Sequence, residues 1–141
     1  MTTPANTARS TKRWKAQIGE NEFQGHTSAI DYNPNYTGSS WKGGDNNTLS
    51  EVTPGDPTIA LTMAQDTENA DSLWRLFHDS PAGTPLTLIW YPHYDGTFAL
   101  SVDLKTLKPQ LVTNRSGGIP EVTLTLPCSE AVTYLADEPE G

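Results

Sequence analysis

The sequence is poor in cysteine, in basic residues and in long hydrophobic runs. Its single cysteine, Cys128, excludes an internal disulfide and is typical of a reducing compartment. Nine lysines and arginines stand against 17 aspartates and glutamates, a formal net charge of −8, so we expect no basic surface of the kind that grips nucleic acid. No stretch approaches transmembrane length, and the first residues lack the apolar run of a secretory signal, so we expect neither feature.

The motifs of common enzyme sites are also missing. The sequence has no glycine-rich phosphate loop at a strand-to-helix junction, no cysteine pair and no histidine pair at metal-binding spacing. His78, Asp79 and Ser80 are the residue types of a hydrolytic triad, but neighbours on a helix point about 100° apart and cannot converge on one proton. We therefore expect a protein that is not an enzyme, with no catalytic residue, no metal site and no cofactor.

Threonine-rich alternation is the dominant pattern that the sequence does contain. Apolar and polar residues alternate, as in half-buried strands, over 14–18, 23–30, 58–63, 86–91, 97–104 and 122–126. A turn at 19–22 is expected to pair the first two of these strands as a hairpin, and residues 131–135 could add a short last strand. About six strands and one helix predict a mainly β fold, a small β-sandwich or partial barrel.

The segment QDTENADSLWRLFHDS, residues 65–80, predicts the one helix. Asp66 or Thr67 can cap its start, and Ser80-Pro81 ends it. Four apolar residues fall at i, i+3, i+4 and i+7: Ala70, Leu73, Trp74 and Phe77. We expect this stripe to pack the helix onto the outside of the sheet.

At 141 residues the chain is expected to form a single domain, 1–141, with three segments outside the strand pattern. Residues 1–12 are small and polar and predict a flexible N-terminal arm, and residues 136–141 form an acidic tail. Residues 31–57 are rich in glycine, asparagine, proline and serine, which predicts a long loop without regular structure. The loop carries three large aromatic residues: Tyr32, Tyr36 and Trp41. These either tack the loop onto its own domain or anchor a partner.

The order of these pieces resembles that of a known family. A threonine/aliphatic strand at 58–64 runs into Gln65-Asp66, and an acidic helix follows. The remaining matching pieces are Ser72-Leu73, Leu76-Phe77, Gly83, the strand at 86–92, Gly117-Gly118 and the strand at 122–126. The set is similar to that of the tail tube (major tail) proteins of bacteriophages with long, flexible, non-contractile tails. The resemblance covers roughly residues 58–127.

The resemblance implies a virion structural protein that assembles with itself. Hairpins from six copies would close a continuous β-barrel, and the hexameric rings would stack into a tube for DNA ejection into the host. Its implied partners are other copies of itself and the tape measure, tail terminator and distal tail proteins. DNA would pass through the lumen without specific binding, and no membrane is involved. The implied location is the virion tail, and the host cytoplasm during assembly.

The same resemblance suggests which residues serve assembly and which face the lumen. The candidates for contacts between subunits and rings are the loop aromatics and the basic residues of the arm: Tyr32, Tyr36, Trp41, Arg9, Lys12 and Arg13. The lumen-facing candidates are polar positions of the strands and turns: Lys15, Gln17, Glu20, Glu22, Gln24, Asp103, Lys105, Glu121 and Thr123. A one-residue slip in register would exchange the two faces of a strand.

Two alternative functions stay open on the sequence. The first is a monomeric β-sandwich that binds carbohydrate or protein, with four aromatic residues as a stacking platform: Trp41, Trp90, Tyr91 and Tyr94. The second is a capsid decoration or tail-terminator protein, which shares the β class. Rings or tubes in concentrated protein would distinguish self-assembly from the monomeric binding module.

Overall fold

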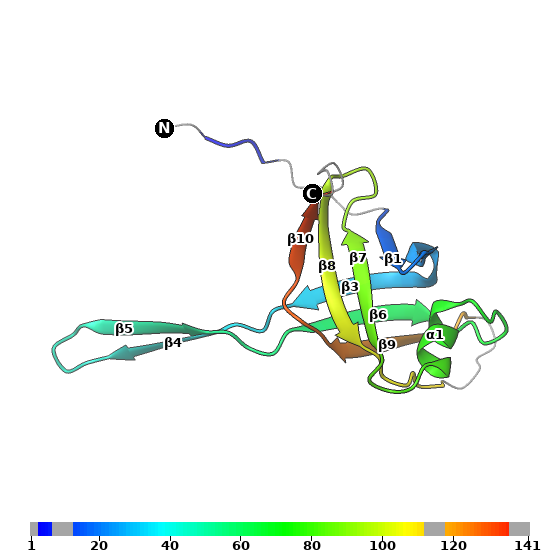
Figure 1. The fold of residues 1–141 in the computed structure, drawn as a ribbon. Coiled ribbons are helices and arrows are strands. Elements are labelled where there is room, and N and C mark those ends of the chain that lie inside the picture. The colour runs from blue at the N-terminus through cyan, green and yellow to red at the C-terminus, as the bar shows by residue number, and fades with distance from the viewer. Residues whose placement is uncertain (1–2, 7–12, 112–117, 136–141) are drawn as a thin grey trace.

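The computed structural model describes residues 3–6, 13–111 and 118–135. These residues contain ten β-strands, one α-helix and one short 3-10 helix, so the predicted mainly β fold with a single helix is confirmed. The strands form a five-stranded, a three-stranded and a two-stranded sheet. The two larger sheets face each other, and the two-stranded sheet projects from them as a long hairpin (Figure 1).

The five-stranded sheet has the order β10-β8-β7-β1-β2, and every neighbouring pair in it is antiparallel. Its strands are β1 (Lys15–Ile18), β2 (Asn21–Glu22), β7 (Pro85–Tyr91), β8 (Phe98–Lys105) and β10 (Val132–Leu135). Leu88 pairs with both Ile18 and Val102 in this register, and all three side chains are buried. Alternation along each strand therefore turns one face of the sheet inward.

The three-stranded sheet has the order β3-β6-β9 and is also antiparallel. Its strands are β3 (Thr27–Asn33), β6 (Thr58–Ala64) and β9 (Glu121–Pro127). Leu61 pairs with Ile30 on one side and Leu124 on the other, and this row is buried. Within the described residues, β3 and β9 each pair with β6 alone, so the sheet has two open edges.

The core lies between the inner faces of these two sheets, whose strands cross rather than align (Figure 1). The five-stranded sheet contributes Ala16, Ile18, Leu88, Val102 and Leu104. The three-stranded sheet contributes Ile30, Ile59, Leu61, Met63, Val122, Leu124 and Leu126. The two sheets join at one corner, where Leu104 bridges to Cys128 and the Ser129 amide donates to the Asp103 carbonyl at 2.7 Å. The sandwich is therefore closed at this corner.

The first predicted hairpin is wrong in its partner. Of residues 23–30, only Phe23 continues beside β1, where its amide donates to the Ala16 carbonyl at 2.7 Å. The 3-10 helix η1 (Gln24–His26) then turns the chain toward the other sheet. The Ala16 amide instead donates to the side-chain Oε1 of Gln24 at 3.2 Å. β1 pairs with the two-residue strand β2 and with β7, so its neighbours come from a short turn and from a distant segment.

The helix α1 spans Leu73–Asp79 and is shorter than the predicted 65–80. Ser72 caps it, rather than Asp66 or Thr67, since the Ser72 Oγ accepts from the Arg75 amide at 3.1 Å. The short polar side chains before it bond the local backbone, with Asp66 accepting from the Asn69 amide, and such bonds compete with helix formation. Ala70 therefore precedes the helix and is exposed, which corrects its predicted packing role.

The other three residues of the predicted stripe are buried. Leu73, Trp74 and Phe77 are at most 4% exposed and join the core cluster. In Figure 1 the helix lies at one end of the sandwich, beside the ends of β6 and β9. Among the described residues, no helix is both long and apolar enough to cross a membrane. The predicted acidic tail, 136–141, and most of the arm, 1–12, lie outside the described residues.

Candidate assembly interface

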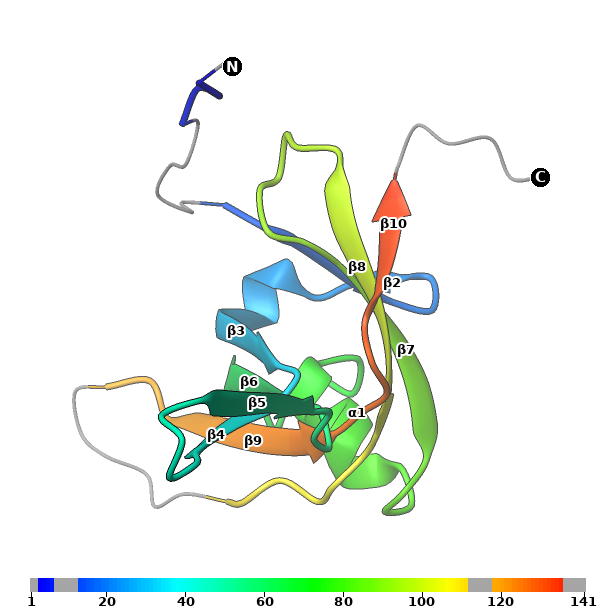
Figure 2. The same cartoon turned by 90° about the vertical axis from the view of Figure 1, so that its left-hand side faces the viewer.

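The segment predicted as an irregular loop, 31–57, is largely regular, which corrects that prediction. It contains the end of β3, the hairpin strands β4 (Thr37–Lys42) and β5 (Thr48–Thr53), and the links between them. Figure 2, which looks toward the hairpin from its side of the molecule, places β4 and β5 in front of the body. Every residue of both strands is exposed.

A tight turn closes the hairpin. Trp41 pairs with Leu49 and Lys42 with Thr48, and the Gly43 amide then donates to the Asn47 carbonyl at 2.8 Å. The turn includes a left-handed residue, Asn46, with φ 72°, a conformation that asparagine tolerates better than most residues. The residues of the turn therefore favour a hairpin, although neither strand faces a hydrophobic core.

That lack of a core is why alternation does not reveal the hairpin. Half-buried strands are recognised by an apolar side facing a core, and both faces of this ribbon are mainly polar. Threonine and valine in the two strands, with a Gly-Gly-Asp-Asn-Asn turn between them, were the available signals.

The hairpin joins the body through a neck rich in proline. Pro34 on one side and Pro54 and Pro57 on the other have no backbone N–H, so they interrupt the ladder between the β3–β6 and β4–β5 pairs. Asn35 holds the neck across the gap, since its Nδ2 donates to the Asp56 carbonyl at 2.7 Å. A Cβ on Gly55 would overlap the backbone carbonyl of Asn35. The neck is therefore a closely fitted junction.

The three loop aromatics occupy different environments. The Tyr32 hydroxyl accepts from the Ala131 amide at 2.9 Å, and its ring packs against the core. The Tyr36 hydroxyl donates to Glu130 at 3.2 Å, and this bond raises the pKa of the tyrosine. Trp41 lies on the hairpin and is 64% exposed. Tyr32 and Tyr36 thus bind their own domain, and Trp41 is the aromatic left for a partner.

The basic candidates of the arm are mostly outside the described residues. Arg9 and Lys12 belong to the part of the arm that the structure does not describe. Arg13 is described, and its guanidinium lies 4.3 Å from the centre of the Tyr94 ring. Its carbonyl accepts from the Tyr94 amide at 3.0 Å, which fixes the entrance to β1 against the turn after β7.

The lumen-facing candidates do not form one surface, which corrects their grouping. Glu121 and Thr123 lie on the three-stranded sheet. Six others belong to the five-stranded sheet or its first turn: Lys15, Gln17, Glu20, Glu22, Asp103 and Lys105. The outer faces of a two-layer sandwich point in opposite directions. Gln24 lies in η1 and bonds the β1 backbone, so it belongs to neither face. Alternation identified the polar side of each strand but not the sheet to which the strand belongs.

The two outer faces differ in charge and in side-chain size. On the five-stranded sheet, Lys15 pairs with Glu22 at 3.3 Å, and Lys105 and Asp103 add one charge of each sign. The outward positions of the three-stranded sheet are small or acidic: Ala29, Asp31, Asn33, Thr58, Ala60, Thr62, Ala64, Glu121, Thr123 and Thr125. β3, β6 and β9 contain no lysine or arginine, so the charged side chains on this face are acidic.

The end of α1 is not arranged as a hydrolytic triad. His78 Nδ1 lies 2.9 Å from Asp79 Oδ1, but both side chains are exposed and His78 stacks on Trp74. The hydrogen bond with His78, and then those with Arg75, keep the pKa of Asp79 below its usual value. The Ser80 amide donates to the Leu76 carbonyl and caps the helix. Elsewhere in the described residues, no three acidic, histidine or cysteine side chains are grouped as metal ligands.

The aromatic residues of the alternative carbohydrate platform are not brought together. Trp90 pairs with the buried Ala16 and faces the core, whereas Tyr91 pairs with Lys15 and faces outward. Trp41 lies on the projecting hairpin. Neighbouring residues of a strand point to opposite faces, so Trp90 and Tyr91 cannot share one stacking surface.

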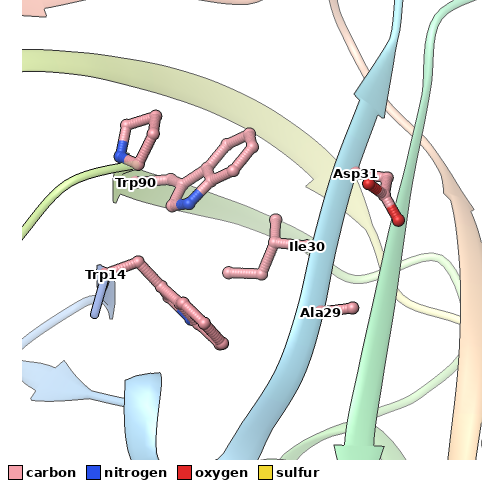
Figure 3. Close-up of a pocket in the computed structure, with 6 residues that line it drawn as sticks. Trp14, Ala29, Ile30, Asp31 and Trp90 are labelled. Carbon is pink, nitrogen blue, oxygen red and sulfur yellow. The ribbon is translucent and has the colours of Figure 1, made fainter. Parts of the chain in front are cut away.

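An apolar groove lies between the two sheets beside the open edge of β3. It has a volume of about 190 Å³ and is lined by Trp14, Ala29, Ile30, Asp31, Trp90 and Pro92. Figure 3 shows the rings of Trp14 and Trp90 on either side of a gap that Ile30 faces. The Trp14 Nε1 donates to Thr27 Oγ1 at 3.0 Å, which holds that ring in place. We call this feature the Trp14–Trp90 groove.

Solved structures from injection systems share this fold. A chain of the PVC sheath-tube complex of an extracellular contractile injection system, in the extended state, matches with a TM-score of 0.61 at 11% identity over 92% of this chain and 93% of that chain. The PVC sheath/tube terminator in the extended state matches with a TM-score of 0.60 at 11% identity, over 93% of this chain and 99% of that chain. The anti-feeding prophage cap, a tube-terminating cap, matches with a TM-score of 0.59 at 12% identity, over 96% of this chain and 97% of that chain.

Comparison with protein-family models and with curated proteins finds no match. At 11–12% identity the structural likeness shows a shared fold. The chain therefore has a tube-related fold found in phage-tail-like injection systems. The matches do not single out the tube family of long non-contractile tails that the sequence resembles.

Proposed function

We propose that this chain is a non-enzymatic structural subunit that assembles into hexameric rings stacked as a tail tube. The observation that carries the proposal is a fully exposed hairpin on a fold shared with chains of sheath-tube and terminator assemblies. An isolated two-stranded hairpin is marginally stable in water. A neighbouring copy would supply the contacts that β4 and β5 lack.

The open edges of the three-stranded sheet support closure into a ring. β3 and β9 run in the same direction, because each is antiparallel to β6. Rotation about an axis along the strands would place β9 of one copy beside β3 of the next, with both strands parallel. Such closure satisfies the unpaired amides and carbonyls that edge strands expose.

The acidic outer face of the three-stranded sheet suits the lumen of this tube. DNA carries a dense row of phosphates, and lysine and arginine are the side chains that hold them. A wall of alanine, threonine, Asp31 and Glu121 offers no such contact, so DNA would pass without binding. We assign the lumen to this face, with Glu121 and Thr123 retained from the sequence-based set and the five-stranded sheet turned away from it.

Negative-stain electron microscopy of concentrated purified protein tests the proposal. We expect tubes built from stacked rings. A particle that stays monomeric at every concentration would contradict self-assembly and favour the monomeric binding module.

A tail terminator or cap is the second candidate. Two of the structural matches are described as a terminator and a tube-terminating cap, at TM-scores of 0.60 and 0.59. A terminator forms one ring at the end of a tube, whereas a tube subunit polymerises. Single rings that never stack in the micrographs would favour the terminator.

We expect Gly55→Ala to weaken assembly. Its Cβ would overlap the Asn35 carbonyl, so the neck must move and redirect the hairpin. Forcing an extra carbon into a packed site typically costs about 1–3 kcal/mol, which corresponds to a rise of about fivefold or more in the concentration for half-maximal assembly. Light scattering against protein concentration measures this rise.

Gly38→Ala is the matched control, since a Cβ there meets nothing within 4 Å. It should change the half-maximal concentration by no more than about twofold. Equal behaviour of the two variants would show that the direction of the neck does not govern assembly.

A further inference from the structure

The Trp14–Trp90 groove and the Trp41 side chain are apolar features of opposite shape. The groove is concave, and the hairpin projects from the body with Trp41 as its most exposed aromatic residue. We propose that the Trp14–Trp90 groove binds the Trp41 side chain of a second copy. This inference rests on the proposed function, because it names the surface that the hairpin reaches during assembly.

The size and lining of the groove suit an aromatic side chain. An apolar cavity of about 150 Å³ is enough to hold benzene, and this groove measures about 190 Å³. The indole rings of Trp14 and Trp90 border it, with Ile30 at its base (Figure 3). Aromatic rings pack favourably against one another in offset and edge-to-face arrangements. An incoming indole would therefore find apolar partners on both sides.

The occupant must come from another copy. β4 and β5 pair with each other and point away from the body, whereas β3 and β7, which supply most of the groove, lie within it (Figure 1). The hairpin therefore cannot fold back to place Trp41 in the groove of its own chain. A second copy offers the same projecting side chain without that restriction.

Charges on the two surfaces are complementary. Trp41 pairs with Leu49 and Ser39 pairs with Glu51, so Glu51 lies on the same face of the hairpin as Trp41. On the groove side of the contact, Arg13 lines a second hollow. This hollow adjoins the Trp14–Trp90 groove, because Trp14 lines both. Glu51 can therefore approach Arg13 when the indole enters. Electrostatic matching of this kind fixes the register of an interface.

Site-directed crosslinking tests the contact. Ser39→Cys, on the same face of the hairpin as Trp41, and Pro92→Cys, which lines the groove, are made in separate proteins. Both carry a Cys128→Ser background, so that a crosslink can form only between copies. The two are mixed with an equal amount of the Cys128→Ser parent, allowed to assemble and treated with a short bis-maleimide. The control replaces Pro92→Cys with Lys105→Cys, an exposed position that pairs with Pro85 at the opposite end of β7 from Trp90.

We expect at least about tenfold more crosslinked dimer from the 39–92 mixture than from the 39–105 mixture, because docking raises the effective concentration of one cysteine near the other. Tubes without an excess of the 39–92 dimer would overturn the groove assignment and leave the proposed function standing. A Cys128→Ser parent that never associates would overturn both, so the two failures are distinguishable.

Discussion

Replacing Trp41 with alanine is expected to leave a folded monomer that no longer forms tubes. The residue lies on a hairpin that lies outside the core, and its side chain is 64% exposed, so the fold does not depend on it. Removal of an aromatic anchor from an interface typically costs about 2 kcal/mol or more, a factor of about 30 in affinity. Because every copy in a tube would repeat this contact, the loss should shift the whole population to monomer.

Sedimentation velocity at the concentration where wild-type tubes form measures the effect. Val52→Ala is the matched control, because Val52 is 69% exposed on the same hairpin but pairs with Gly38, on the face opposite Trp41. The control should assemble, and the melting temperature of both variants should stay near that of the wild type. Replacing residues 37–53 by a short flexible linker should give the same monomer as Trp41→Ala. If the truncated protein still builds normal tubes, the hairpin has no role in assembly.

Phe77→Ala is expected to destabilise the monomer strongly. The side chain is fully buried between the helix and the sandwich, and removing a core phenylalanine typically costs about 3–5 kcal/mol. A domain of this kind has a total stability of about 5–15 kcal/mol, so the variant would lose a large part of it. Urea denaturation followed by tryptophan fluorescence gives the difference directly.

Phe98→Ala is the matched control for that measurement. Phe98 is the same residue type on β8, but 52% of it is exposed. The control should cost less than about 1 kcal/mol. Similar losses in the two variants would contradict the placement of α1 as the element that closes the end of the core.

The parts of the fold that face the core could be predicted from the sequence. β6 and β9 place apolar side chains at every second position, and these side chains are the ones that the structure buries. In β8 the same holds for Val102 and Leu104, whereas Phe98, at the start of the strand, is exposed. Leu73, Trp74 and Phe77 likewise follow the helical period. A pattern of this kind indicates which side of an element is buried, because burial in the core favours apolar residues there.

Elements with no buried side were missed or misplaced by the sequence-based prediction. Both hairpin strands are exposed throughout, so no alternation marked β4 or β5. Ala70 matches the helical period, but the hydrogen bonds of Asp66 and Asn69 hold the preceding segment in turns. Local side-chain bonding therefore decided the start of the helix where the apolar period alone could not.

Sheet membership was also beyond the reach of periodicity. Asp103 and Glu121 both stand on the polar side of a strand, yet they lie on sheets that face opposite ways. The pairing of β7 with β1 and of β6 with β9 joins segments that are far apart in sequence. The Trp14–Trp90 groove depends on the same long-range pairing, because its residues come from β3, from β7 and from the chain beside β1 and after β7.

Sedimentation velocity of the wild-type protein over a wide concentration range tests self-assembly most directly. We predict that the 15.4 kDa monomer is replaced, as concentration rises, by a species of six copies and then by longer stacks of such rings. A single 15.4 kDa species at every concentration, with electron micrographs free of rings and tubes, would contradict the account.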